Sequence, residues 1–432
     1  MIKDVLNKLG DWDRRDFLSF SAKAFLGVGL MPQFIRSSAL AGASPSRRPS
    51  AKNVIYLYMA GGMSHIDTFD PKPNSDNQGP VETIKTNVDG IRISEYFPSL
   101  ARQMDKVALI RSMTSTQGAH AEGNYFMHSS YVKRGTIVHP GLGSWITKMS
   151  GLRNNKLPGA VTVGGRSAAG AGGAGFFEAR YAPLVIGNPE AGLQNSKMRK
   201  GVSEKEFQET LMLTESFDKA FHSKYNHRDV QAYTDMYDDA VKLMKSKDIK
   251  AFDLDLEPKE LRESYGDNPF GQGCLLARRL VEHDVRFVEV GLGGWDTHSN
   301  NFETLTSKTA ILDQALGALL PDLYRRGMLE ETMVVLATEF GRTPEINQND
   351  GRDHSPAAFS CLIAGGGVRG GQVYGKTDEH AKRVVENKVT PPDFNATIAY
   401  ALGLPLEKEV FSANGRPFTV ANKGIPVVDL FG

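Results

Sequence analysis

Residues 333–356 read MVVLATEFGRTPEINQNDGRDHSP, and this stretch decides the fold that the sequence predicts. Its first five residues form a continuous apolar run, typical of a strand buried on both faces of a parallel sheet. Glu339 and Arg342 follow where that strand ends, which is the place where open α/β sheets bind ligands. Asp353 and His354 come further along the same loop. Either they belong to a site or they form a polar turn with an incidental histidine.

The same order of apolar strand, polar loop and amphipathic helix recurs along the chain. Strands are expected in six apolar runs, at residues 54–59, 106–113, 161–163, 285–290, 333–337 and 361–364. Helices are expected at residues 272–283, 300–326 and 391–402. This alternation predicts an α/β fold with a mostly parallel central sheet and helices on both faces.

Composition narrows the class of protein. The 51 Lys and Arg residues balance 50 Asp and Glu residues among 432, so no net field would attract nucleic acid or an anionic membrane. Neither partner is expected. The two cysteines, Cys274 and Cys361, are too few for a disulfide framework, and each sits in an apolar run. Two buried thiols are therefore expected.

Residues 1–41 resemble a twin-arginine export signal. Arg14 and Arg15 precede a moderately apolar stretch at 20–35, and an Ala-Leu-Ala sequence then fits the small-residue cleavage rule. The apolar stretch is too short and too interrupted for a membrane span. These features predict a periplasmic or extracellular protein without a membrane span in its mature chain. An ordinary amphipathic first helix is the alternative.

The remaining residues, 52–432, are expected to form one α/β domain that carries an insertion. From about residue 190 to 265 the chain is polar and charged with helical periodicity. Phe217, Phe221 and Tyr225 show the spacing of one helix face. We expect this segment to form a helical cap or lid that shapes access to the site.

Three expected strand ends carry histidine together with carboxylate. The pairs are His65 with Asp67, Asp296 with His298, and Glu339 with the later Asp353 and His354. If the three strands are neighbours, these side chains converge at one sheet edge. Imidazole and carboxylate ligands suit zinc, manganese or iron better than calcium. The pattern predicts a divalent-metal or acid/base site. His120 and Arg342 are expected as catalytic residues on its rim. The alternative is that these histidines are ordinary hydrogen-bonded loop residues.

Five motifs together resemble a known family. They are AGGMSHIDTFDPKP at 60–73, GGWDTH at 293–298, ATEFGRTP at 337–344, GRDHSPAAF at 351–359 and PPDFNATIAYALGL at 391–404. Over nearly its whole exported length the chain resembles the family catalogued as domain of unknown function 1501, which is grouped with the alkaline phosphatase and sulfatase superfamily. The resemblance implies an alkaline phosphatase/sulfatase-like fold and a divalent metal. It also implies hydrolysis of phosphate or sulfate esters of small molecules or polysaccharides.

The resemblance assigns roles to single residues. His354 matches the late lone histidine ligand of the superfamily, and Asp296 with His298 resembles the ligand set of one metal. Glu339 stands at the acid of an Asp-His pair, with Phe340 in place of the second residue.

Elsewhere the chain departs from the superfamily pattern. Glycines follow the first strand where an acidic ligand is expected, so His65 and Asp67 are the nearest substitutes. Residues 114–120 lack a Cys-x-Pro-x-Arg signature, so a formylglycine nucleophile is not expected. Arg342 is expected either to clamp a phosphoryl or sulfuryl oxygen bidentately or to pair with Glu339.

Two functions from different classes remain open on the sequence. In the first, the protein is an exported hydrolase. A metal ion held by Asp296, His298, Glu339 and His354 polarises the ester and activates water or a hydroxyl. In the second, a binding or scaffolding protein keeps the fold without the chemistry. Fold alone does not choose between them.

Overall fold

The structure is a computed structural model that describes residues 50–164, 172–194, 201–203, 205–214 and 239–431. The export-signal prediction for residues 1–41 lies outside these ranges, as do Phe217, Phe221 and Tyr225 of the expected insertion. Among the described residues, the structure contains no helix with the length and apolar character that crossing a membrane requires.

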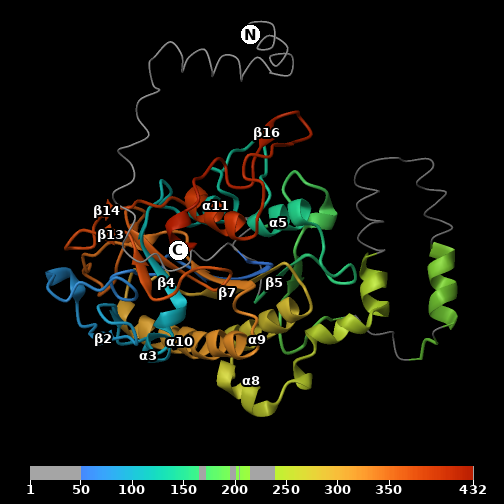
Figure 1. The fold of residues 1–432 in the computed structure, drawn as a ribbon, viewed down its shortest axis with the longest axis horizontal. Coiled ribbons are helices and arrows are strands. Elements are labelled where there is room, and N and C mark those ends of the chain that lie inside the picture. The colour runs from blue at the N-terminus through green and yellow to red at the C-terminus, as the bar shows by residue number, and fades with distance from the viewer. Residues whose placement is uncertain (1–49, 165–171, 195–200, 204, 215–238, 432) are drawn as a thin grey trace, which may run out of the picture. The chain divides into compact units, whose positions relative to one another are not determined.

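An eight-stranded sheet has the strand order β12-β4-β11-β8-β1-β7-β5-β6 (Figure 1). Its strands are β1 (Asn53–Ala60), β4 (Val107–Met113), β5 (Ala160–Val163), β6 (Leu184–Ile186), β7 (Phe287–Gly293), β8 (Thr332–Ala337), β11 (Phe359–Ala364) and β12 (Gln372–Tyr374). Every neighbouring pair is parallel except those of β11, which runs antiparallel to β8 and β4. The predicted fold class, a mostly parallel central sheet, is confirmed.

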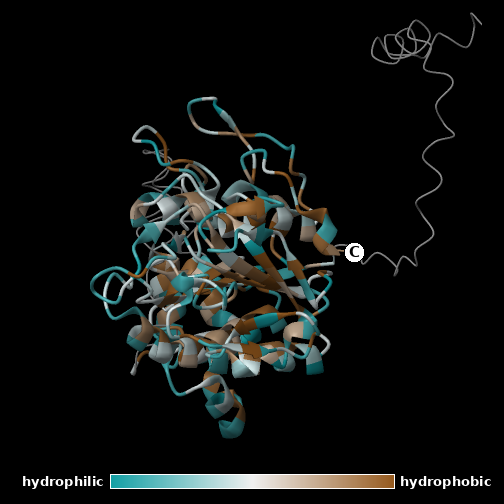
Figure 2. Cartoon of the chain, turned by 90° about the vertical axis from the view of Figure 1, so that its left-hand side faces the viewer, coloured by the Kyte–Doolittle hydropathy of each residue, from teal (hydrophilic) through white to brown (hydrophobic). Residues whose placement is uncertain are grey.

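Alternate residues of β1 enter two separate cores, one on each face of the sheet. Ile55 and Leu57 pack with residues of α3 (Pro98–Ala101), α9 (Pro269–Glu282) and α10 (Asn301–Arg325). Tyr56 and Tyr58 pack with residues of the helices on the other face, which are α4 (His120–Ser129), α5 (Leu142–Ser150) and α11 (Pro391–Ala401). Figure 1 shows these two helix layers above and below the strands. In Figure 2 the hydrophobic residues concentrate in the central strands, as expected for a sheet buried on both faces.

Among the described residues, four two-stranded sheets lie outside the central sheet. They are the strand pairs β2 (Thr83–Lys85) with β3 (Arg92–Ser94), β9 (Gly341–Arg342) with β10 (His354–Ser355), β13 (Lys376–Thr377) with β14 (Val384–Glu386), and β15 (Val410–Phe411) with β16 (Pro417–Phe418). The β9-β10 pair places His354 directly opposite Arg342. The loop after β8 therefore folds back on itself and brings His354 close to the carboxyl end of β8.

The described end of the expected insertion packs firmly on the sheet layer. The 3-10 helices at Lys247–Phe252 and Leu254–Leu256 lead into α8 (Lys259–Tyr265), and Phe252 and Tyr265 are buried in the core with α9 and α10. Buried apolar side chains thus attach residues 247–265 to these two helices, and the helical lid expected at about residues 190–265 stays a prediction. Cys274 and Cys361 are free and buried, as predicted.

Candidate metal centre

The site lies at the carboxyl ends of β8, β1 and β7, which are adjacent in the sheet. Glu339 follows β8, and Asp296 and His298 follow β7. His120 comes from a different source, because it is the first residue of α4. His354 arrives on β10. Neighbouring parallel strands bring their ends to one edge, so the convergence expected from the sequence is realised for these residues.

Two glycines after β1 make room for the site. Gly61 has φ +123°, and a Cβ atom built on it would lie 2.5 Å from the backbone nitrogen of Asp296. Gly62 has φ +79° and would meet the ring of Phe340. The backbone after β1 thus passes against the Asp296 loop at a distance that only glycine permits.

Gly61→Ala is expected to lower the free energy of unfolding by more than about 1 kcal/mol, because the new side chain meets both backbone strain and a steric clash. Gly327→Ala is the matched control, since Gly327 also has positive φ (+68°) but nothing within 4 Å of the added Cβ. Urea denaturation of both variants measures the difference. An equal loss in the two variants would contradict the argument from crowding.

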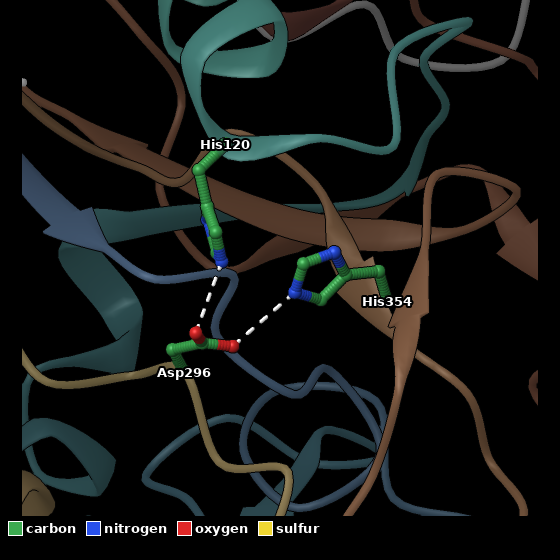
Figure 3. Close-up of side chains that lie close together, drawn as sticks. All are labelled: His120, Asp296 and His354. Atoms are coloured by element: carbon green, nitrogen blue, oxygen red, sulfur yellow. Dashed lines mark hydrogen bonds and ion pairs between the residues drawn. The ribbon is translucent and has the colours of Figure 1, made fainter.

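His120, Asp296 and His354 form a group that can hold a metal ion, with one ligand atom from each lying within 4.8 Å of the others. Nε2 of His120 lies 3.2 Å from Oδ2 of Asp296, and Nε2 of His354 lies 3.2 Å from Oδ1. Figure 3 shows the two rings pointing at different oxygens of the carboxylate. His298 adds a third ring, with Nε2 3.3 Å from Oδ1 of Asp296 and 3.0 Å from Nε2 of His354.

Each of the three rings also has an acceptor of its own next to Nδ1. Nδ1 of His120 lies 2.8 Å from Oε1 of Glu339. Nδ1 of His298 lies 2.7 Å from Oδ1 of Asp353. The third acceptor is the carbonyl oxygen of Gly118, 2.9 Å from Nδ1 of His354. Carbonyls and ionised carboxylates only accept, so each Nδ1 donates its proton to its partner, and Nε2 is the nitrogen of each ring that faces Asp296.

Glu339 is an orienting residue in this arrangement. It is fully buried, and the backbone N–H of Gly61 also donates to Oε1 at 2.8 Å. The hydrogen bond with Glu339 raises the pKa of His120, outweighing the opposite effect of partial burial. Gly123 lets α4 approach, because a Cβ there would lie 3.2 Å from Cβ of Glu339. A carboxylate that fixes the tautomer and direction of a ligand ring is a recurrent feature of metal sites.

Arg342 lies beneath the site. Its guanidinium is fully buried and donates to Oδ1 of Asp296 at 2.5 Å, to the carbonyl oxygens of Gly61 and Trp295, and to that of Gly62 at 2.8 Å. Burial disfavours ionisation of Asp296, yet the hydrogen bonds from Arg342 and His354 prevail and lower its pKa to about 2. These contacts engage Arg342 with Asp296 and with backbone carbonyls rather than with Glu339, and its expected role as an oxygen clamp stays a prediction.

His65 and Asp67 do not join this group. Nε2 of His65 lies 2.8 Å from the carbonyl oxygen of Ala381, and the ring is fully buried. Both oxygens of Asp67 accept from the guanidinium of Arg352, at 2.7 and 2.8 Å. The prediction that all seven residues share one pocket is therefore corrected for His65 and Asp67, because Nε2 of His65 and both oxygens of Asp67 are engaged by partners outside the metal group.

The geometry fits a divalent cation. Nitrogen ligands lie about 2.0–2.1 Å from zinc, so two ligand atoms at octahedral or tetrahedral angles are about 2.8–3.4 Å apart. The separations of 3.2 Å and 3.0 Å among the ring nitrogens and Asp296 match this range. Nε2 of His120 is also buried without a hydrogen-bond partner, because its approach to Asp296 lacks hydrogen-bond geometry. In neutral rings, nitrogen lone pairs that face one another and a carboxylate favour a cation between them.

Sequence reasoning missed the contribution of Gly118. Its carbonyl oxygen orients His354, and a backbone acceptor has no side-chain signature in the sequence. His120 was expected on the rim of the site, whereas the structure places it within the three-residue group. The sequence did contain a signal for this position, because His120 follows the apolar strand β4 and begins the helix α4.

Comparisons with solved structures found likenesses at low identity. The lipoteichoic acid synthase LtaP from Listeria monocytogenes is 9% identical over 84% of this chain and 74% of its own, with a TM-score of 0.42. The PsFucS1 sulfatase from Pseudoalteromonas sp. is 13% identical over 89% and 72%, with a TM-score of 0.42. The alkaline phosphatase from the Antarctic bacterium TAB5 is 15% identical over 83% and 100%, with a TM-score of 0.38.

A comparison with curated proteins found no match. A family model described as protein of unknown function (DUF1501) matches residues 51–431, nearly the whole described domain. The match extends from the start of β1 to the end of the chain and includes every residue of the candidate metal centre. The chain therefore belongs to the DUF1501 family of proteins of unknown function.

Proposed function

We propose that this protein is an exported, metal-dependent hydrolase of phosphate or sulfate esters. The observation that carries the proposal is the convergence of the Nε2 atoms of His120 and His354 on the carboxylate of Asp296, with Nδ1 of each ring hydrogen-bonded to an acceptor on its other side. The ester class rests on the motif resemblance to the alkaline phosphatase and sulfatase superfamily. Zinc, manganese and iron are the ions that this nitrogen and oxygen ligand set favours.

His120, Asp296 and His354 would hold the ion, with His298 as a further ligand. When bound, a divalent cation polarises an ester oxygen and lowers the pKa of a bound water. Arg342 holds Asp296 in place from below, so the carboxylate remains ionised and directed at the rings. Asp296 and His298 are each 46% exposed at the side chain, which leaves the group open to an ester from solvent.

Metal analysis tests the proposal directly. Protein purified without chelator is expected to contain zinc, manganese or iron. It is also expected to hydrolyse an aryl phosphate or an aryl sulfate, to lose that activity after treatment with chelator and to regain it when the metal returns. Protein that contains no metal and takes up none would favour the alternative, a binding or scaffolding protein.

We also propose export by the twin-arginine route, on the sequence pattern at residues 12–41. Changing Arg14 and Arg15 together to lysine is expected to leave the full-length protein in the cytoplasmic fraction. Immunoblotting of fractionated cells measures the distribution. Normal export of the double variant would exclude this route.

A further inference from the structure

A closed circuit of hydrogen bonds joins the loops that carry the candidate metal centre. Its four members, Asp67, Thr297, Asn301 and Arg352, are each at most 3% exposed. Nδ2 of Asn301 donates to Asp67 at 3.0 Å, and the hydroxyl of Thr297 donates to Oδ1 of Asn301 at 2.6 Å. The backbone N–H of Arg352 donates to the carbonyl oxygen of Thr297 at 3.0 Å. The guanidinium of Arg352 then closes the circuit on both oxygens of Asp67.

Two members of the circuit are direct sequence neighbours of the site residues. Thr297 lies between Asp296 and His298, and Arg352 directly precedes the pair Asp353–His354. Each of these two circuit members therefore fixes the backbone from which neighbouring side chains reach the metal centre. Asp67 connects them to the loop after β1, although it is 285 residues away from Arg352 in the sequence.

The hydrogen-bonding capacity of Asp67 is fully used. Its carboxylate accepts from Arg352, from Asn301 and from the hydroxyl of Ser64, the last at 2.6 Å. Burying an ion pair costs desolvation energy that offsets much of the attraction, so such pairs contribute little net stability. Their better-attested effect is to select one geometry among several. Here the selected geometry is the mutual placement of the loop after β7 and the loop that carries His354.

We infer that Asp67, Asn301, Arg352 and the hydroxyl of Thr297 are positioning residues that set the affinity of the metal centre without touching the ion. This inference rests on the proposed function, because it presupposes that the centre binds a divalent cation. It gives a role to the AGGMSHID motif that differs from ligation. Outer-shell partners of this kind typically change metal affinity by about 10–100-fold.

Cobalt(II) titration of the metal-free full chain tests the inference, with the visible absorption spectrum as the readout of coordination geometry. Asp67→Asn and Thr297→Val are each expected to weaken cobalt binding by about 10–100-fold and to alter the spectrum. Thr297→Ser keeps the hydroxyl and is expected to retain wild-type affinity and spectrum. If Asp67→Asn does not fold, the comparison of Thr297→Val with Thr297→Ser still tests the inference.

Glu257→Gln serves as the matched control, because it weakens a buried ion pair with Arg278 among α9, α10 and the segment before α8. It is expected to lower stability while leaving cobalt affinity unchanged. Wild-type affinity and spectrum in Thr297→Val, or an equal loss in Glu257→Gln, would overturn the inference. Wild-type protein that binds no cobalt would instead overturn the proposed function, and this inference with it.

Discussion

His354→Ala is expected to reduce metal affinity by at least about 10–100-fold, the range already seen when only an outer-shell partner is lost. His354 supplies one of the nitrogens next to Asp296, and Nδ1 of its ring is held by a backbone carbonyl. The side chain is 25% exposed and lies on the two-residue strand β10, outside both cores. The fold is therefore expected to survive the substitution. Isothermal titration with zinc, paired with urea denaturation, measures both quantities.

His380→Ala is the matched control for this experiment. His380 is another loop histidine beside a carboxylate, but its partner is Glu379 and its ring is 51% exposed. Its removal is expected to leave zinc affinity unchanged. If His354→Ala bound zinc as tightly as the wild type, His354 would not be a ligand.

Arg278→Ala is expected to lower the free energy of unfolding by up to about 3–5 kcal/mol, because the buried carboxylates of Glu257 and Asp322 lose the fully buried cation that they share. Among the described residues, they retain only the partly exposed Arg326 and, for Glu257, Arg279 as cationic partners. The Arg278 side chain is fully buried in α9. Its nitrogens lie 2.8 Å from Glu257, 2.6 Å from Glu282 and 3.1 Å from Asp322. These pairs connect α9 to α10 and to the segment before α8. The midpoint of urea denaturation at an unchanged slope reports the loss.

Arg262→Ala provides the comparison. Arg262 also pairs with a carboxylate at 2.7 Å, but its partner Asp255 is 86% exposed. Solvent-exposed pairs contribute about 0–1 kcal/mol. Similar losses in the two arginine variants would show that burial does not set the strength of the network around Arg278.

The layered α/β architecture could be predicted from the sequence alone. The apolar runs gave six of the eight sheet strands, because a strand buried on both faces must be continuously apolar. The two it omitted, β6 and β12, are three-residue strands at the sheet edges, where half-exposed residues blur that pattern. The antiparallel direction of β11 was also not predicted. A parallel return needs a crossover, usually a helix, and the polar loop between β8 and β11 contains none.

The sequence likewise located chemistry at strand ends, since polar residues directly after an apolar strand are a local feature. Only the tertiary structure decided which of those residues meet. It joined His120 and Glu339, which are 219 residues apart, and it paired Asp67 with Arg352 rather than with the metal group. It also buried Arg342 under Asp296. The physical reason is that apolar periodicity is read within one element, whereas the partner of a charged side chain depends on which strands become neighbours.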